Sequence, residues 1–358
     1  MVELTVEIPT YNERDNLPIL VNKLQNLGLD LEIVIIDDNS PDRTYEVADE
    51  LSHQYSNVKV IKRPGKMGLA SAIADGLKVA NGKYVAIMDA DLQHPPETLV
   101  KMLNEAKSGN DIIIASRYIS EGSSGKFSFF RKIVSKGATF LAHAILRETR
   151  NVKDPMSGYF IFRKDILDGK KIESKGYKVL LEVLVKGGPD RKVSEVPYVF
   201  GERYLGQSKL TMGENLKFIG LLLLLSEFRP LKFIVVGLTG ILVNEGLLFA
   251  LHTFTPLSLL YAGIISIESS ILSNFLLNHL WTFKGRNVGS LFRGISRYNL
   301  IALPGGIINL LTLLKLAEVT HYLIANIIGI MLAFAFNYIG SEMIVWGRRK
   351  GSQPDKRN

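Results

Sequence analysis

The second half of this chain of 358 residues is almost wholly apolar, and this feature constrains its structure more than any other. Four apolar stretches occupy residues 231–251, 257–281, 294–316 and 322–345. Each has about 20 residues or more, the length that a helix needs to cross the hydrocarbon core of a bilayer. The first half mixes charged and apolar residues, as soluble domains do. The sequence therefore predicts a soluble domain followed by four membrane-spanning helices.

Basic residues mark one side of the four stretches. The turns at 253–256 and 318–321 contain no Lys or Arg, whereas the other connections contain Arg229, Lys232, Lys284, Arg286, Arg293 and Arg297, and the tail after residue 347 contains five more. The positive-inside rule then predicts that both termini and the soluble domain are cytoplasmic. The N-terminus has no signal-peptide pattern, which agrees with this topology. Since topology accounts for the net charge of +8, we expect no nucleic-acid partner.

The first half alternates strand-like and helix-like segments. Strand-like runs lie at 2–8, 31–37, 58–61, 84–88 and 111–115, and helix-like stretches lie between them at 16–27, 44–53, 69–80 and 96–107. Such alternation predicts an α/β fold in which helices cover both faces of a mostly parallel sheet. In sheets of this kind the ligand binds beyond the carboxyl ends of the strands.

Polar clusters follow three of these strands. They are 9–13 (Pro-Thr-Tyr-Asn-Glu), 37–40 (Asp-Asp-Asn-Ser) and 89–93 (Asp-Ala-Asp-Leu-Gln). A turn or a helix cap would explain any one of them alone, but together they predict a site at one edge of the sheet. The chain has no cysteine, which excludes thiol catalysis and thiolate metal sites. P-loop, nucleophile-elbow, zinc-protease and dinucleotide-binding motifs are also absent, which argues against the usual kinases, hydrolases and proteases.

Asp89 and Asp91 are the chemical centre of these clusters. Two carboxylates two residues apart follow a strand end, and Gln93 adds an amide oxygen. Oxygen ligands suit the hard cations Mg²⁺ and Mn²⁺, which bridge substrate phosphates rather than sitting in an all-protein cage. An acidic surface turn is the alternative for the pair taken alone. We expect Mn²⁺ or Mg²⁺ as the cofactor.

Several longer motifs carry a family resemblance. Residues 8–13 (Ile-Pro-Thr-Tyr-Asn-Glu), 36–42 (Ile-Asp-Asp-Asn-Ser-Pro-Asp), Gly68 and 89–95 (Asp-Ala-Asp-Leu-Gln-His-Pro) resemble the family-2 glycosyltransferases, which implies a GT-A fold. Residues 115–118, 131–138, 154–159 and 203–209 are similar to the dolichyl-phosphate mannosyltransferases and to relatives that make polyprenyl-phosphate glucose. Residues 273–283 resemble the GtrA-type four-span membrane proteins.

The resemblance implies three parts and a role for each matching residue. The parts are a cytosolic GT-A domain at 1–210, an interfacial linker at 211–228 and a membrane domain at 229–358. The donor nucleotide would contact Pro9, Tyr11, Glu13, Ile36, Asp38, Asp89, Ala90, Asp91, Arg203 and Lys209. The metal would bind Asp89, Asp91 and Gln93, and catalysis would use Asp89, Asp91, Arg117, Arg203 and Lys209. The acceptor phosphate would contact Arg117, Arg131 and Ser135.

The segment at 127–147 carries both apolar bulk and basic charge, as does a helix that lies in the membrane interface. We expect a lipid phosphate to be presented there, although an ordinary helix packed on the sheet is the alternative. The apolar segment at 216–225 is too short to span and also predicts an interfacial helix.

The expected reaction is an inverting transfer of mannose from GDP-mannose to dolichyl (polyprenyl) phosphate. Transfer of glucose from UDP-glucose to the same lipid class is the nearest alternative, because the motifs are the same. A flippase for lipid-linked sugars, or a membrane anchor, is the alternative outside enzymes, and it leaves Asp89 and Asp91 unexplained. Membrane lipids are the remaining expected partner.

Overall fold

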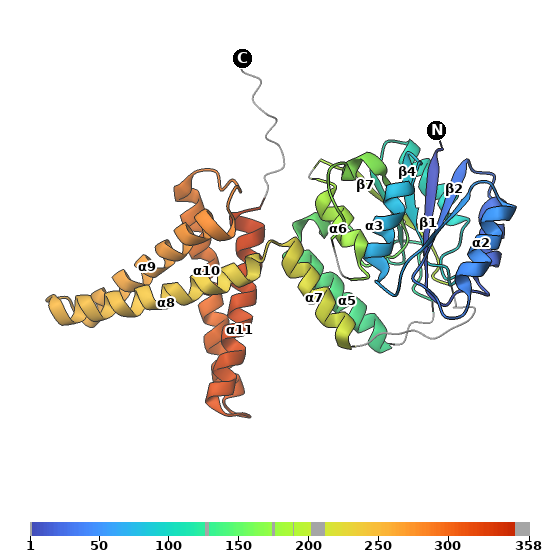
Figure 1. Ribbon diagram of the computed structural model, residues 1–358. Coiled ribbons are helices and arrows are strands. Elements are labelled where there is room, and N and C mark those ends of the chain that lie inside the picture. Colours follow the sequence, from blue (N-terminus) through green and yellow to red (C-terminus); the bar gives the residue numbers. More distant parts are fainter. Residues whose placement is uncertain (1, 126–128, 174–175, 189, 202–211, 348–358) are drawn as a thin grey trace, which may run out of the picture. The chain divides into compact units, whose positions relative to one another are not determined.

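The computed structural model describes residues 2–125, 129–173, 176–188, 190–201 and 212–347 (Figure 1). The chain divides into two compact units, Met1–Leu225 and Ser226–Asn358. The first unit contains a sheet and its helices, and the second is helical. Arg203 and Lys209, which the sequence assigns to the site, lie outside the described residues.

A sheet of seven strands forms the centre of the first unit, in the order β3-β2-β1-β4-β6-β5-β7. The strands are β1 (Leu4–Thr10), β2 (Leu31–Asp37), β3 (Val58–Lys62), β4 (Tyr84–Ile87), β5 (Ile112–Ser116), β6 (Phe160–Arg163) and β7 (Val193–Pro197). All pairings are parallel except those of β6, which runs antiparallel to β4 and β5. This mostly parallel sheet confirms the predicted α/β class.

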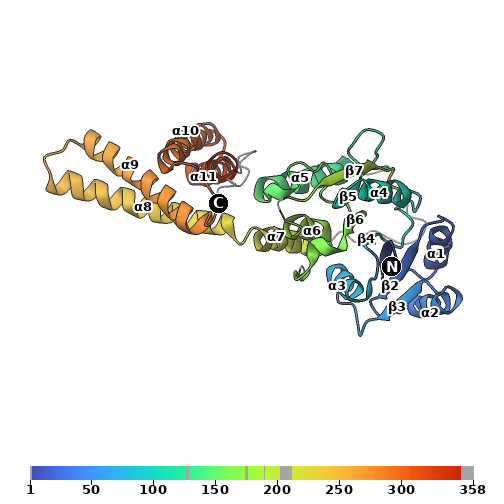
Figure 2. The ribbon, with the colours of Figure 1, turned by 90° about the horizontal axis from the view of Figure 1, so that it is seen from above.

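Helices cover both faces of the sheet (Figure 2). They are α1 (Leu17–Gln25), α2 (Thr44–Gln54), α3 (Leu69–Val79), α4 (Thr98–Lys107) and α6 (Val179–Lys186), and two short 3₁₀ helices are η1 (Arg147–Thr149) and η2 (Lys164–Leu167). One apolar core lies under α1, α2 and α4, and a second lies under α3 and α6. Because β1 and β2 are covered on both faces, they are buried along almost their whole length, including the polar Thr5 and Glu7 of β1.

Two further helices, α5 (Phe129–Ile145) and α7 (Met212–Leu225), lie side by side (Figure 1). Their inner faces share a cluster with α6 that contains Ala142, Leu146, Leu181, Phe218 and Leu222. Apolar side chains also remain exposed on both helices, namely Ile133, Val134, Phe140 and Leu141 on α5 and Leu216, Ile219 and Leu224 on α7. Each helix thus combines a packed face with an exposed apolar one, as an interfacial helix requires. Their location in the interface stays a prediction.

The second unit consists of α8 (Arg229–Phe254), α9 (Leu259–Leu277), α10 (Leu291–Leu316) and α11 (Tyr322–Gly340), with π-helical turns η3 (Asn278–Thr282) and η4 (Ser341–Val345) after α9 and α11. Among the described residues, four helical segments are long and apolar enough to cross a membrane: Arg229–Phe254, Leu259–Thr282, Leu291–Leu316 and Ile327–Val345. These are the four predicted spans.

The two helix pairs of this unit are built alike. In the first pair the backbone of Gly240 on α8 meets the side chain of Asn274 on α9, and in the second Gly305 on α10 meets Asn337 on α11. A Cβ atom at either glycine would overlap the asparagine. Small residues let membrane helices approach closely, so both glycines are required by the packing.

Candidate active site at the carboxyl edge of the sheet

Three strand ends bring the predicted polar clusters together. Strand β1 lies between β2 and β4, and all three run in the same direction. Thr10 ends β1, Asp37 ends β2, and Asp89 lies two residues beyond β4. The strand order reverses between β1 and β4, which is where open α/β sheets bind their ligands. The predicted convergence of the three clusters is therefore present.

Asp37 organises this edge from within. Its carboxylate is fully buried and accepts hydrogen bonds from Thr10 Oγ1 at 3.0 Å, from Ser40 Oγ at 2.5 Å and from the Ser40 backbone N at 2.9 Å. The side chain thus joins the ends of β1 and β2. It shapes the turn that presents Asp38.

Asp38 holds the loop that leads into α3. Its carboxylate pairs with the Arg63 guanidinium and accepts a hydrogen bond from the Gly68 backbone N at 2.9 Å. Arg63 also donates to Asp75 at 3.1 Å and to Ser71 at 2.8 Å. Gly68 has a φ of +97°, which favours glycine. The sequence resemblance assigned Asp38 to the donor nucleotide but did not identify Arg63 as its partner. A basic residue directly after β3 was the sequence feature that pointed to such a partner.

The other residues assigned to the nucleotide differ in exposure. The Lys66 ammonium lies 3.8 Å from the centre of the Tyr11 ring, and Glu13 accepts a hydrogen bond from Asn16 Nδ2 at 2.8 Å. Pro9 pairs with Ile36 across the β1–β2 ladder. Ile36 and Ala90 are buried, at 0% and 2% exposure, so their side chains belong to the core. Only their backbone could meet a ligand.

The predicted metal ligands share one tight turn. Asp91 is buried and its Oδ1 accepts a hydrogen bond from the Gln93 backbone N at 3.1 Å, whereas the Asp89 side chain is 47% exposed. Gln93 Nε2 donates to the Gly201 carbonyl at 3.0 Å, so the amide oxygen is the atom turned away from that bond. Two carboxylates and an oriented amide oxygen fit Mg²⁺ or Mn²⁺. No group of three His, Cys, Asp or Glu that could enclose a metal occurs among the described residues.

His94 follows this turn and was given no role from the sequence. It is 2% exposed, it stacks on Tyr159 with ring centres 4.9 Å apart, and its Nδ1 accepts a hydrogen bond from the Asp89 backbone N at 3.1 Å. Burial lowers the pKa of His94, against the opposing charges of Asp89 and Asp91. The sequence showed only that His94 follows the acidic turn, whereas its burial and its hydrogen bond to Asp89 depend on the fold.

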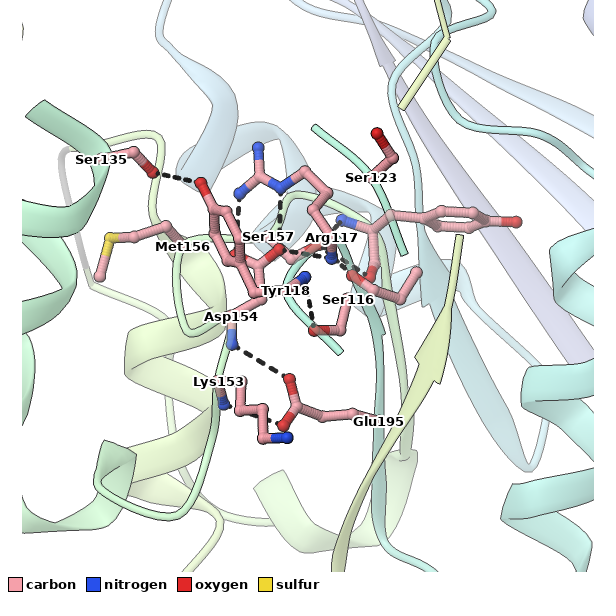
Figure 3. Close-up of polar contacts among 12 residues, drawn as sticks. Ser116, Arg117, Tyr118, Ser123, Ser135, Lys153, Asp154, Met156, Ser157 and Glu195 are labelled. Carbon is pink, nitrogen blue, oxygen red and sulfur yellow. Dashed lines mark hydrogen bonds and ion pairs between the residues drawn. The ribbon is translucent and has the colours of Figure 1, made fainter. Parts of the chain in front are cut away.

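An ion pair between Arg117 and Asp154 occupies the edge beyond β5 (Figure 3). Arg117 donates from Nε and from a terminal nitrogen to the two oxygens of Asp154, each at 2.8 Å, and its backbone N donates to the same carboxylate at 3.0 Å. Burial alone would lower the pKa of Arg117, but the hydrogen bonds and charge of Asp154 raise it. The guanidinium is therefore permanently charged and held in one orientation.

Glu195 on β7 supports the loop that carries Asp154. Its two carboxylate oxygens accept hydrogen bonds from the backbone N of Lys153 at 2.9 Å and of Asp154 at 3.0 Å (Figure 3). Ser157 in the same loop donates to the Ala115 carbonyl on β5 at 2.8 Å. Strands β5 and β7 thus fix the partner of Arg117 from two sides. Sequence reasoning noted 154–159 only as a motif and did not find Glu195.

The acceptor residues come from two elements. Tyr118 follows Arg117, and its hydroxyl lies 2.9 Å from Ser135 Oγ on α5 (Figure 3). This contact brings α5 to the loop after β5, so Ser135 and Arg117 belong to one neighbourhood. Arg131 also lies on α5, and its side chain is outside the described part of the structure. Its assignment stays a prediction.

Family models match both halves of the chain. The model for glycosyl transferase family 2 matches residues 5–169, and that for the GtrA/DPMS transmembrane domain matches residues 232–346. A dolichol-phosphate mannosyltransferase of Pyrococcus furiosus is 43% identical over 353 residues, which cover 96% of this chain and 99% of the relative. The chain belongs to the dolichol-phosphate mannosyltransferase family. It is an integral membrane glycosyltransferase, as the sequence predicted.

Eukaryotic members of the family match a shorter part of the enzyme. The dolichol-phosphate mannosyltransferase of Saccharomyces cerevisiae is 35% identical over 223 residues, which cover 59% of this chain and 82% of the relative. Among solved structures, the mannosyltransferase PcManGT of Pyrobaculum calidifontis, in complex with GDP-Man and Mn²⁺, is similar with a TM-score of 0.41 and 14% identity over 96% of this chain and 87% of that one. A likeness that remote says nothing about the ligands of this enzyme.

Proposed function

We propose that this enzyme transfers mannose from GDP-mannose to dolichyl (polyprenyl) phosphate and releases GDP. The observation that carries the proposal is that two groups of residues lie at one edge of the sheet. The turn at Asp89 and Asp91 offers carboxylate oxygens, and Arg117 and Ser135 on α5 offer a cation and a hydroxyl. The first group suits a nucleotide sugar with its metal, and the second suits an acceptor phosphate. The 43% identity to the Pyrococcus furiosus enzyme supports mannose and dolichyl phosphate as the substrates.

Asp89, Asp91 and Gln93 would hold a divalent cation, Mn²⁺ or Mg²⁺, on the donor diphosphate. A bound cation supplies neutralisation of the charge that develops on the leaving diphosphate. The protein contributes the orientation of the ligands, since Asp91 is fixed by the Gln93 backbone and Gln93 by the Gly201 carbonyl. Pro9, Tyr11, Glu13 and Asp38, with the backbone of Ile36 and Ala90, would line the nucleotide, and Arg203 and Lys209 would complete its phosphate contacts.

The acceptor would need no general base. A phosphate monoester has a second pKa near about 6, so the lipid phosphate is already largely dianionic at neutral pH. Arg117, Arg131 and Ser135 would orient one of its oxygens toward the anomeric carbon, on the side opposite the leaving diphosphate. The bidentate bond to Asp154 keeps the Arg117 guanidinium in a fixed plane for this task. One in-line displacement inverts the configuration at the anomeric carbon.

The lipid character of the acceptor suits α5 and α7. Their exposed apolar side chains, such as Phe140 at 63% and Leu216 at 75% exposure, would enter the interface of the cytoplasmic leaflet. The basic connections between the spans support a cytoplasmic catalytic domain and cytoplasmic termini. We propose domain limits of 1–210, 211–228 and 229–358.

Transfer to dolichyl phosphate tests the proposal directly. Detergent-purified protein receives labelled GDP-mannose or UDP-glucose, each with Mn²⁺ or with a chelator. Lipid-soluble label is expected from GDP-mannose and Mn²⁺ only, and Asp91→Asn should lower its rate at least about 100-fold, as loss of transition-state charge stabilisation does. Asp165→Asn, a change at a side chain that is 57% exposed, is the matched control.

Other results would contradict parts of the proposal. Label from UDP-glucose alone would replace mannose by glucose, and label from neither donor would reject the reaction. Full activity in the presence of the chelator, or of the Asp91→Asn variant, would contradict the proposed metal site. Retention at the anomeric carbon would reject the single displacement.

A further inference from the structure

Both ring nitrogens of His94 face Asp89. The Asp89 backbone N donates to His94 Nδ1 at 3.1 Å, and His94 Nε2 lies 3.9 Å from Asp89 Oδ2. Since Nδ1 accepts that bond, the proton of the neutral ring must be on Nε2. The N–H of His94 is therefore near the Asp89 carboxylate, at a separation longer than a hydrogen bond. One side chain thus contacts both the main chain and the carboxylate of a single residue.

Aromatic packing holds the His94 ring in this orientation. The ring stacks on Tyr159 at an interplanar angle of 16°, and Tyr198 and Phe200 meet it edge-on at 6.0 Å between ring centres. The Tyr159 hydroxyl donates to the carbonyl of Pro95, the next residue, at 3.0 Å. With 2% exposure, the imidazole has little room to rotate.

A packing role alone does not account for this arrangement. A phenylalanine or leucine would fill an aromatic core without the free energy that burying two ring nitrogens costs. The Asp89 side chain is 47% exposed, so solvent reaches its carboxylate. Asp91 differs, because it is buried and hydrogen-bonded within its own turn. Asp89 is thus the more exposed of the two carboxylates, and the buried His94 ring lies beside it.

We propose that His94 is a positioning residue that fixes the Asp89 carboxylate in the orientation needed to bind the divalent cation. This inference rests on the proposed function, in which Asp89 is a metal ligand. His94 touches neither substrate nor metal in this role. It acts by accepting the backbone N–H of Asp89 at Nδ1 and by the electrostatic attraction between Nε2–H and the carboxylate 3.9 Å away.

Two substitutions separate the contacts of His94. In His94→Asn the amide can accept from the Asp89 backbone but does not reach the carboxylate. In His94→Gln the longer amide reaches the carboxylate but leaves the backbone N–H without its partner. Tyr159→Phe is the matched control, because it removes a hydrogen bond from the same core and leaves both His94 nitrogens in place.

The readout is Mn²⁺ affinity of the full-length protein with GDP present, measured by electron paramagnetic resonance of free Mn²⁺. Each His94 variant should bind Mn²⁺ about 10-fold or more weakly, the usual cost of losing a residue that orients a metal ligand. The Mn²⁺ concentration for half-maximal transfer should rise by the same factor, while kcat at saturating Mn²⁺ recovers. Tyr159→Phe should lower the melting temperature and leave Mn²⁺ affinity within about twofold, since the ligands keep their orientation.

The outcomes distinguish this inference from the proposed function. If either folded His94 variant binds Mn²⁺ as the unaltered protein does, the positioning role is wrong, even where Asp91→Asn still abolishes binding. If Asp91→Asn and the unaltered protein bind Mn²⁺ equally, the metal site fails and the inference fails with it. Where one His94 variant does not fold, the other decides.

Discussion

Replacing Asp154 by Asn should destabilise the catalytic unit and disable the acceptor site. Asp154 is fully buried and accepts three hydrogen bonds from Arg117, two of them from the guanidinium. Asn removes the charge and turns an acceptor oxygen into an N–H donor that faces the donors of Arg117. Removing one partner of a buried ion pair costs about 3–5 kcal/mol, because the other charge is left uncompensated.

That free energy predicts a measurable fall in melting temperature. At about 2–4 °C per kcal/mol for a domain of this size, the transition of the catalytic unit should fall by roughly 10 °C. Thermal unfolding of the full-length protein in detergent measures it. The control is Asp165→Asn, which breaks a pair between exposed side chains and should cost less than about 1 kcal/mol.

At temperatures below the melting transition, Asp154→Asn should also lower the activity. With Arg117 released from its fork, kcat/KM for the lipid phosphate should fall by about 100-fold, as expected for a displacement of about 1 Å at a positioning group. Arg117→Lys, which keeps the charge and loses the fork, should fall similarly. A melting temperature of Asp154→Asn within about 2 °C of that of the unaltered protein would contradict a buried ion pair here, because breaking a buried pair costs more free energy than breaking a surface pair.

Two further changes test burial elsewhere in the chain. Glu7 on β1 is fully buried, and its carboxylate oxygens have no hydrogen-bond partner among the described residues. Burial raises the pKa of Glu7 well above its usual value, although the charge of Lys164 acts to lower it. The folded state therefore keeps a proton that the unfolded state loses above about pH 4.5, so stability falls as pH rises, by up to about 1.4 kcal/mol per pH unit. Glu7→Gln should remove that slope in melting curves between pH 5 and 8, and an equal slope in both proteins would contradict the assignment. In the membrane unit, Gly305→Ala should lower the melting temperature by overlapping Asn337, whereas Gly306→Ala, with open space around it, should not; equal effects would exclude the glycine contact.

Local sequence pattern predicted the framework of this protein. The strands β1 to β5 and the helices α1 to α4 follow from apolar runs and their alternation, which depend on neighbours a few residues apart. The four spans follow from length and apolarity alone. The convergence of 9–13, 37–40 and 89–93 needed only the rule that parallel strands end at one edge. The sequence resemblance added the glycosyltransferase family, and the relatives confirmed it.

Tertiary structure decided which polar residues pair and therefore which of them are held rigid. Strand β6 enters the sheet antiparallel between β4 and β5, and it carries the loop of Asp154 to Arg117, 37 residues away. Arg63 reaches Asp38 across 25 residues, and the aromatic core turns His94 toward Asp89. Pairing over such separations depends on strand order and side-chain packing, which leave no periodic trace along the chain. The sequence by itself therefore determined the kinds of residue available for chemistry, whereas the fold determined their partners, their burial and hence their charge.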